Sequence, residues 1–278
     1  MQAKLAALTT LEWLAGLARR LGLGAIVDRV APIASRPFER FVLDVDGVQI
    51  GGIDLAQLHY VRELRELGRE RTFVRLLAEA IPSGGVVVEG GAHLGFVTVH
   101  EARAVGPDGR VVVFEPNGRV LGVLRENLLA NGVEARVEIV PKALGDSPGS
   151  ARFFIRGDES SLYEPGGDAD PVEIEVVRAD DVIDGPVDVV KLDVEGAELA
   201  ALRGMERFMT AERPPRAVFL ECNPVLLERA GSTRDELFVW LRERAYDIEW
   251  IDEANGRTVS ISEPWTEPYV NLLCRHRR

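Results

Sequence analysis

From residue 86 onward, short apolar runs alternate with helical stretches, and this alternation constrains the fold more than any other feature. The runs are rich in Val, Ile and Leu, as is typical of strands buried on both faces of a parallel sheet. We predict strands at 86–89, 110–115, 137–140, 187–193 and 217–221. Helices are predicted near 95–104, 120–131, 197–209 and 233–245. Alternating strands and helices imply right-handed crossovers, and therefore an α/β protein.

Two further strands are predicted near the end of the chain, at 247–252 and 269–274. The connection between them contains Gly256, Pro264 and Pro268 and has no convincing helical pattern. Because a parallel crossover normally needs a helix, these two strands are expected to pair antiparallel. The pattern thus predicts a mostly parallel seven-stranded sheet with an antiparallel C-terminal strand.

The beginning of the chain is organised differently, and we expect a helical and hairpin extension at 1–81 followed by the main domain at 82–278. Thr9 and Glu12 form a capping box ahead of an apolar stripe with helical spacing. The dipeptide Asp46-Gly47 follows an alternating segment and is a strong signal for a hairpin turn.

Composition excludes several classes of partner. The net charge is −12, and a surface of this sign repels nucleic acids and anionic membranes. No apolar stretch approaches the roughly 20 residues that span a bilayer. Cys222 and Cys274 are the only cysteines, too few for a disulfide framework. We therefore expect a cytoplasmic protein that acts on a small molecule.

A glycine loop follows the first predicted strand, in the segment V-V-V-E-G-G-A-H-L-G at 86–95. Gly90, Gly91 and Gly95 permit a sharp turn and leave bare backbone for a ligand to approach. Such a loop fits either a dinucleotide or S-adenosylmethionine. Ala92 occupies the third position of the dinucleotide fingerprint, where its methyl group would crowd a pyrophosphate. The spacing therefore favours S-adenosylmethionine, which has no pyrophosphate.

Acidic residues end the first two predicted strands, where ligands of such sheets bind. Glu89 ends the first strand, and Glu115 ends the second within V-V-V-F-E-P-N. A carboxylate at Glu115 can accept hydrogen bonds from both hydroxyls of a ribose. One isolated acid here would usually be a solvated charge, but two acids on either side of a glycine loop favour a nucleoside site.

The fourth predicted strand runs into the charged sequence V-V-K-L-D-V-E-G-A-E, which spans residues 189–198. Strand alternation sends Lys191, Asp193 and Glu195 to one side. Since buried charges need partners, Lys191 could neutralise Glu195 or Glu221 at the edge of the sheet. Its position relative to the glycine loop favours a functional role instead.

Together these motifs resemble the FkbM family of S-adenosylmethionine-dependent methyltransferases, over about residues 70–252. The K-x-D-x-E-G-x-E motif at 191–198 is the most specific element of the resemblance. The other matching positions are Glu89, Gly91, Ala92, His93, Gly95, Phe114 to Asn117, Asn127, Lys142 to Leu144, Gly149 and Phe153. The chain departs from the family pattern at His93, which replaces an asparagine, and at Glu221-Cys222-Asn223, where an acid and a histidine are usual.

The resemblance implies a Rossmann-like class I methyltransferase fold and methyl transfer to a hydroxyl of a sugar, polyketide or other secondary metabolite. The implied cofactor-binding residues are Glu89, Gly91, Ala92, His93, Gly95, Glu115, Pro116, Asn117, Lys142, Ala143 and Asp193. Asp193 is the expected base or acceptor-orienting acid, with Glu195 and Glu221 as alternatives. Lys191 is expected to hold the carboxylates or to lower the pKa of the acceptor hydroxyl. His93 is expected to contact the cofactor and not to act as a base.

Several alternatives remain open on the sequence. An NAD(P)-dependent oxidoreductase is disfavoured by Ala92 and by the absence of a Tyr-x-x-x-Lys motif, and a non-catalytic binding module is the third class. Asp193, Glu221 and Asn223 could hold magnesium, but a metal-free hydrogen-bond network would use them equally well and is favoured. The loop at 157–170 fits a mobile segment over a binding site and a plain disordered insertion equally well, and with the N-terminal helices it is expected to determine acceptor specificity. The N-terminal helices are also candidates for a homo-oligomer contact.

Overall fold

The computed structural model divides the chain into two compact units, Met1–Arg69 and Glu70–Arg278. The residues it describes are 10, 13–14, 17–18, 20–21, 42–52, 60–61, 63–64, 68, 70–156, 159–161, 171–262 and 265–277. The predicted capping box at Thr9 and Glu12 and most of the 157–170 loop lie outside these residues. The second unit begins before helix α4 (Arg71–Ala80), which the sequence had grouped with the N-terminal extension.

The first unit contains the predicted hairpin. Strands β1 (Leu43–Val45) and β2 (Val48–Ile50) pair antiparallel around Asp46 and Gly47. Both turn residues have positive φ, 49° and 80°, as a two-residue turn of type I′ requires. Asp44 fixes this turn because its carboxylate accepts a hydrogen bond from the Gly47 backbone N–H at 3.1 Å.

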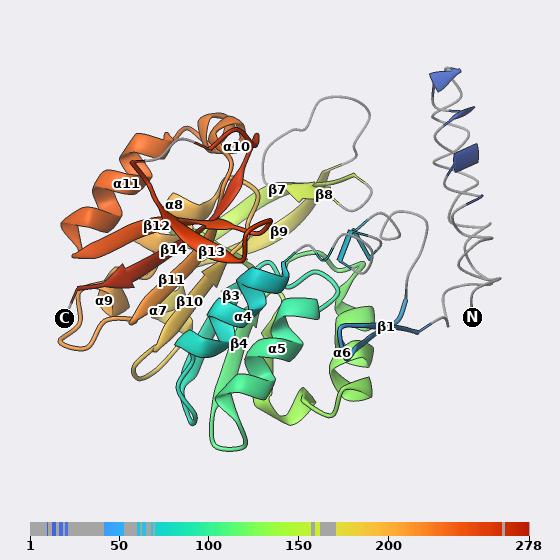
Figure 1. Ribbon diagram of the computed structural model, residues 1–278, viewed down its shortest axis with the longest axis horizontal. Helices are drawn as coiled ribbons and strands as arrows, with labels where there is room; N and C mark the ends of the chain where they lie inside the picture. Colours follow the sequence, from blue (N-terminus) through green and yellow to red (C-terminus); the bar gives the residue numbers. More distant parts are fainter. Residues whose placement is uncertain are drawn as a thin grey trace. The chain divides into compact units, whose positions relative to one another are not determined.

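The second unit is built on an eight-stranded sheet with the order β13-β12-β14-β11-β10-β3-β4-β5 (Figure 1). Its strands are β3 (Val86–Gly90), β4 (Arg110–Phe114), β5 (Val137–Val140), β10 (Val189–Leu192), β11 (Ala217–Cys222), β12 (Tyr246–Asp252), β13 (Arg257–Ser260) and β14 (Val270–His276). Strands β5, β4, β3, β10 and β11 are parallel, and β14 runs antiparallel to both β11 and β12. The predicted seven strands and the antiparallel C-terminal strand are confirmed.

The eighth strand, β13, lies in the connection that the sequence left without structure. It forms an antiparallel hairpin with β12 at the edge of the sheet, where Arg257 faces Asp252. Of its four residues only Val259 is buried, so the strand carries no apolar pattern that the sequence could reveal.

A second sheet, absent from the sequence prediction, has the order β6-β9-β7-β8. Its strands are β6 (Ala143–Leu144), β7 (Gly149–Arg156), β8 (Glu159–Ser161) and β9 (Pro171–Val177). It has a small core of its own, formed by Ala143, Phe153 and Ile174. Only Glu173 and Glu175 of β9 are polar, and V-E-I-E-V at 172–176 alternates as in a half-buried strand, so the signal was present in the sequence and was missed.

Helices cover the central sheet between its strands. These are α4, α5 (Phe96–Val105), α6 (Leu121–Ala130), the 3-10 turn η3 (Glu134–Arg136), α7 (Ala179–Val182), α8 (Glu198–Arg203), α9 (Glu206–Met209), α10 (Pro224–Arg229) and α11 (Arg234–Glu243). Helix α5 packs across β3 and β4, and α11 packs on β12 (Figure 1). None of the helices in the described part of the chain has the length and apolarity to cross a membrane.

The predicted helix at 197–209 is broken into α8 and α9 around Gly204. A Cβ atom at Gly204 would lie 2.0 Å from the carbonyl oxygen of Gly145. The break therefore marks a close approach between this helical segment and the chain after β6. No local pattern in the sequence reports such an approach.

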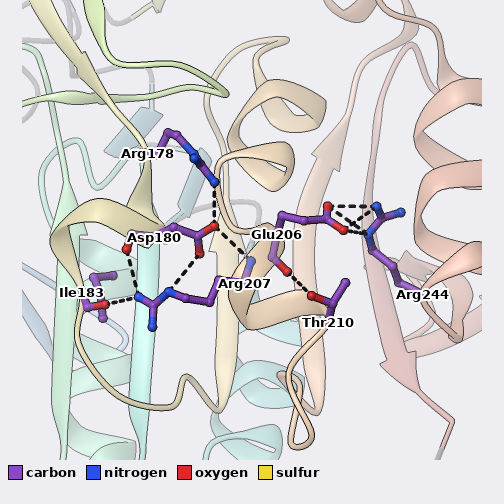
Figure 2. A network of polar contacts seen from close by, with 7 residues as sticks. All are labelled: Arg178, Asp180, Ile183, Glu206, Arg207, Thr210 and Arg244. Carbon is purple, nitrogen blue, oxygen red and sulfur yellow. Dashed lines mark hydrogen bonds and ion pairs between the residues drawn. The ribbon is translucent and has the colours of Figure 1, made fainter.

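A polar network joins α7 to α9 (Figure 2). The Asp180 carboxylate accepts hydrogen bonds from the Arg178 guanidinium and from the Arg207 backbone N–H, each at 3.0 Å. The Arg207 guanidinium donates in turn to the carbonyl oxygens of Asp180 and Ile183, at 2.9 and 2.6 Å. The network thus satisfies backbone groups of α7, which is too short to satisfy them itself.

Candidate cofactor and catalytic site

The strand ends that carry the predicted site residues lie side by side. Strand β3 sits between β10 and β4, and in this register Glu89 is opposite both Lys191 and Val113. The loops that follow these three strands therefore leave the same edge of the sheet, the edge where ligands of open α/β sheets bind. The sheet brings together the glycine loop, the loop after β4 and the loop after β10, as predicted.

The glycine loop is held against both neighbouring strands. The Gly91 N–H donates to the Phe114 carbonyl oxygen at 3.0 Å, and a Cβ at Gly91 would lie only 1.9 Å from the carbonyl oxygen of Asp193. Gly91 and Gly95 have φ of 78° and 86°, which side chains disfavour. Glycine is thus required at Gly91 by the fold itself, in addition to the bare backbone that a ligand would use.

Glu115 ties the glycine loop to the end of β4. Its carboxylate is buried, and it accepts hydrogen bonds from the backbone N–H groups of His93 at 2.9 Å and Asn117 at 2.8 Å. Burial raises the pKa of Glu115, and the two hydrogen bonds act against that rise. Each oxygen keeps acceptor capacity beyond these bonds. His93 thus enters the site through its backbone, with φ of 50°.

Asn127 anchors the loop from the opposite side. Its side-chain amide, buried on α6, donates to the Leu94 carbonyl oxygen at 2.8 Å. A Cβ at Gly95 would contact the Leu124 side chain of the same helix at 2.6 Å. Helix α6 therefore packs directly on the end of the glycine loop, and the helical asparagine noted in the sequence positions that loop.

Lys191 lies in the middle of the site, with only 4% of its side chain exposed. Its Nζ donates to the Gly91 carbonyl oxygen at 2.7 Å and lies 3.3 Å from Glu89 Oε1 and 3.9 Å from Asp193 Oδ2. Burial acts to lower the pKa of Lys191, but the carboxylates of Glu89 and Asp193 outweigh it and raise that pKa. Lys191 is therefore a fixed cation, and its ion pairs within the described residues join the glycine loop to Asp193.

Asp193 is the most open carboxylate of the cluster, since 43% of its side chain is exposed. Its backbone N–H donates to the Gly90 carbonyl oxygen at 3.0 Å, so its place beside the glycine loop is fixed. It combines access to solvent with a neighbouring cation, as a group that meets a substrate must.

The turn after Asp193 is strained. Glu195 has φ of 53° and Gly196 has φ of 99°, and a Cβ at Gly196 would lie 2.5 Å from the Leu226 carbonyl oxygen. Glu198 stabilises this turn because its Oε1 accepts from the backbone N–H groups of Val194 at 3.1 Å and Gly196 at 3.2 Å. Burial raises the pKa of Glu198 to about 7. The last acid of the motif is therefore a scaffold for the turn, a role that the motif alone did not reveal.

The remaining predicted residues have varied surroundings. Glu221, the residue before the last of β11, is half-buried and lies opposite Asn271 of β14. The Asn223 side chain caps α10 by accepting from the Leu226 N–H at 3.3 Å. Within the described ranges, no group of three or more His, Cys, Asp and Glu side chains is arranged to hold a metal ion.

Lys142 and Ala143 turn toward the second sheet. The Lys142 ammonium pairs with Glu175 of β9 at 2.5 Å, and Ala143 is buried in β6. Pro116 is half-buried between Glu115 and Asn117. Cys222 and Cys274 are free and buried, and burial raises the pKa of Cys222 to about 12, so its thiol stays protonated.

Two residues of the site were missed by the sequence prediction. Thr98 and Glu101 are buried on α5, and the Thr98 hydroxyl donates to Glu89 Oε2 at 2.6 Å. Their signal is present but weak, because two polar residues three positions apart interrupt an otherwise apolar helix face.

The strand order, with an antiparallel last strand inserted beside β11 and a glycine loop after the first parallel strand, defines a Rossmann-like class I methyltransferase fold. Residues 89–248 match the family described as the methyltransferase FkbM domain. The chain belongs to the FkbM methyltransferase family, in agreement with the resemblance seen in its motifs.

One curated relative is methyltransferase sdnD of Sordaria araneosa, 26% identical over 162 residues. The match covers 45% of this chain and 62% of that relative, less than two thirds of its length. Among solved structures, methyltransferase FkbM of Methylobacillus flagellatus is 16% identical with a TM-score of 0.44, covering 90% of this chain and 60% of that one. An S-adenosylmethionine-dependent O-methyltransferase of Thermotoga maritima is 14% identical with a TM-score of 0.45, covering 86% and 79%. Since both scores are below 0.5, the fold assignment rests on the strand order.

Proposed function

We propose that this protein is an S-adenosylmethionine-dependent O-methyltransferase that acts on a hydroxyl of a small molecule such as a sugar, a polyketide or another secondary metabolite. The observation that carries the proposal is Glu115, whose buried carboxylate is held beside the glycine loop by the His93 and Asn117 N–H groups. These donors fix the carboxylate in the position where it can accept from two ribose hydroxyls. Membership of the family supports the same cofactor.

The residues present fit S-adenosylmethionine. The loop from Gly91 to Gly95 would face its methionine part, and Glu115 would accept from its ribose. When bound, the cofactor supplies a methyl group activated by a positive sulfur. Ala92 is buried in the loop, and its methyl group would crowd a pyrophosphate at that position, which disfavours the dinucleotide alternative.

Asp193 is the residue that we propose to meet the acceptor. Its half-open carboxylate can take the proton of an acceptor hydroxyl, and the ammonium of Lys191 at 3.9 Å holds that carboxylate in place. Glu195 and Glu221 are the alternative bases. We expect the Asp193→Asn variant to keep cofactor affinity within several-fold and to lose most turnover, because an amide cannot take a proton.

We propose that the reaction needs no magnesium. Asn223, one of the three oxygen ligands considered from the sequence, uses its side chain as the cap of α10. Methyl transfer should therefore be indifferent to exhaustive chelation and to added magnesium. Loss of activity on chelation, with recovery on adding magnesium, would overturn this expectation.

The experiment that tests the function is calorimetric titration with S-adenosylmethionine and with NADH, followed by a screen of sugar and polyketide alcohols with a labelled methyl donor. We expect binding of S-adenosylmethionine alone, weakened by one to two powers of ten in Glu115→Gln, which has lost the charge of the ribose acceptor. Binding of NADH would favour an oxidoreductase. Cofactor binding without transfer to any alcohol would point to a binding module.

The remaining properties are proposals of the same kind. The net charge of −12 supports a cytoplasmic enzyme whose partner is a small-molecule acceptor and not a nucleic acid or a membrane. The N-terminal helices are the proposed contact for a homo-oligomer, and sedimentation of the full chain and of a fragment without them would test this.

A further inference from the structure

Glu101 is a fully buried acid that the proposed reaction does not use. It lies on α5, the helix that packs across β3 and β4. Residues three apart share a helix face, so Glu101 lies on the same face as Thr98, whose hydroxyl donates to Glu89 Oε2. Glu101 is within hydrogen-bonding reach of the Glu89 carboxyl group. Helix α5 therefore presents both polar side chains to Glu89.

The hydrogen bonds around this pair of acids are incomplete. Glu89 Oε1 lies 3.3 Å from Lys191 Nζ without forming a hydrogen bond to it. Neither oxygen of Glu101 meets a donor within the described residues. Two carboxyl groups that face each other in a buried site, with Lys191 and Thr98 the donors near them among the described residues, are best satisfied by a proton between them.

The charges of the buried cluster lead to the same conclusion. Glu89 and Glu101 are each 0% exposed and share one buried cation, Lys191. Burial and the charge of Glu89 raise the pKa of Glu101 well above its ordinary value, and Lys191 only partly opposes them. Since a second uncompensated carboxylate would be costly in this environment, one of the two acids must be neutral.

We propose that Glu101 is a neutral carboxylic acid that donates its proton to Glu89 Oε1, and that it is a positioning residue for the cofactor loop. This inference rests on the proposed function. With its Oε1 satisfied by Glu101, Glu89 leaves the Lys191 ammonium free to hold the Gly91 carbonyl oxygen at 2.7 Å. Without that proton, Oε1 would have only Lys191 to satisfy it, and the ammonium would be drawn away from Gly91.

The first test needs no ligand. The infrared spectrum of the full chain near neutral pH should show the C=O band of a buried carboxylic acid, and the difference between wild type and Glu101→Gln isolates Glu101 from other buried acids such as Glu198. We expect the band to be lost in the variant. A difference spectrum without such a band would overturn the neutral state of Glu101.

The second test measures affinity for S-adenosylmethionine by calorimetry. Glu101→Gln keeps a donor toward Glu89 and should bind within about threefold of wild type, whereas Glu101→Leu has none and should bind about tenfold more weakly. Val99→Ala, a cavity at a buried apolar position of the same helix, is the matched control and should leave affinity unchanged. Equal affinity of the Leu variant and wild type, or an equal loss in Val99→Ala, would overturn the positioning role.

The pH dependence of cofactor affinity distinguishes an effect of the Glu101 proton from an effect of side-chain packing. Wild-type affinity should fall relative to that of Glu101→Gln as pH rises toward the pKa of Glu101, because the variant has no proton to lose there. The ratio of the two dissociation constants cancels the titration of the cofactor and of the surrounding charged groups, Glu70, Glu89, His100, Glu115, Lys191 and Asp193. A constant ratio up to the alkaline limit of folding would contradict the inference.

Failure of this inference is distinguishable from failure of the proposed function. If the wild-type chain binds no S-adenosylmethionine, the proposed function fails and takes the positioning role with it, while the infrared comparison still decides whether Glu101 is neutral. If wild type binds the cofactor and the variants do not differ from it as expected, only the role of Glu101 is lost.

Discussion

At several glycines, one neighbouring backbone atom determines whether a side chain can be accommodated. At Gly91, Gly196 and Gly204, an added Cβ would lie only 1.9, 2.5 and 2.0 Å from a backbone carbonyl oxygen. Gly122, by contrast, has open space around it. The described glycines thus include some fixed by close backbone approach, some required by a positive φ, such as Gly47, and some, such as Gly122, that are free to change.

We predict that Gly91→Ala lowers the free energy of unfolding by at least about 2 kcal/mol. The alanine would be strained at a φ of 78°, and its Cβ would force the loop away from the Asp193 carbonyl oxygen. Affinity for S-adenosylmethionine should fall at least tenfold. Gly122→Ala, within helix α6, is the control and should be neutral or stabilising by up to about 1 kcal/mol. Urea unfolding and calorimetry measure both effects, and similar behaviour of the two variants would contradict the role given to Gly91.

The raised pKa of Glu198 leads to a prediction about how the stability of the fold depends on pH. Its pKa is raised from an ordinary 4.5 to about 7 by burial, so the folded chain binds this proton more tightly than the unfolded chain does. Stability from this group is therefore fully present below about pH 4.5 and is lost as pH rises to about 7. In Glu198→Gln that loss is absent, so the stability of the variant relative to wild type should rise by about 3 kcal/mol over this window.

Urea unfolding of both proteins at several pH values between 4.5 and 8 measures this difference. The Gln side chain can still accept from the Val194 and Gly196 N–H groups, so the turn should survive. A difference in stability that stays constant across the window would show that Glu198 is ionised in the folded protein.

At the scale of elements, groups far apart in sequence complete the ends of helices. The N-cap residue of α4, Glu70, makes no capping hydrogen bond with its side chain. Instead the Glu253 carboxylate, in the turn between β12 and β13, accepts from the Thr72 and Phe73 N–H groups, each at 2.9 Å. Arg75 returns a hydrogen bond to the Gly256 carbonyl oxygen at 3.0 Å. The C-terminal hairpin thus fixes the start of α4.

Glu253→Ala should lower the free energy of unfolding by about 1–2 kcal/mol, because it leaves two N–H groups of the first turn without an acceptor and removes a charge that favours the helix dipole. Glu79→Ala, which removes an exposed pair with Arg75 on the same helix, should cost no more than about 0.5 kcal/mol. Thermal and urea unfolding compare the two variants. An equal, small effect of both would show that water replaces the cap.

A second long-range link joins α9 to the end of α11. Arg244 forms a bidentate ion pair with Glu206, through Nη2 at 2.8 and 2.9 Å and through Nε at 3.2 Å (Figure 2). Its guanidinium also stacks over the Trp240 ring at 3.8 Å. Bidentate geometry and the stacked ring make this pair more specific than an ordinary surface ion pair. It lies beside the Asp180 network, so α7, α9 and α11 are joined by side chains of opposite charge.

For the whole molecule, the division at Arg69 and Glu70 makes a further prediction. A fragment of residues 70–278 contains every residue of the candidate cofactor site and should fold and bind S-adenosylmethionine within about threefold of the full chain. Acceptor methylation should fall, because the N-terminal extension is one of the segments expected to determine acceptor specificity. Calorimetry and the methyl-transfer assay separate the two effects.

A fragment that folds but binds no cofactor would show that the first unit contributes to that site. Normal methylation by the fragment would assign the extension to packing or oligomerisation instead. The acceptor site would then have to be sought near the 157–170 loop.

The sequence determined the central sheet and the location of the site. Continuous apolar runs such as Val86–Val88 are typical of strands buried between two layers of helices, so the pattern predicted the parallel strands. The lack of a helix between the last two strands predicted the antiparallel end. The glycine loop, the F-E-P-N segment with Glu115 and the 191–198 motif are each one continuous stretch of sequence next to a predicted strand, so their positions at strand ends followed directly. For the same reason the hairpin at Asp46-Gly47 was predictable, since its turn chemistry is local.

Tertiary structure alone decided the features that depend on contacts between distant segments. The second sheet exists because β7 and β9 pair with each other, and the alternation of apolar and acidic residues in β9 does not say which strand it pairs with. The sequence could not show that Lys191 would reach Gly91, a hundred residues away, or that Glu101 of α5 would lie beside Glu89 of β3. The physical reason is that the hydrogen bonds and charges of a buried polar group are completed by whatever the fold brings beside it, and local pattern contains no record of that neighbour.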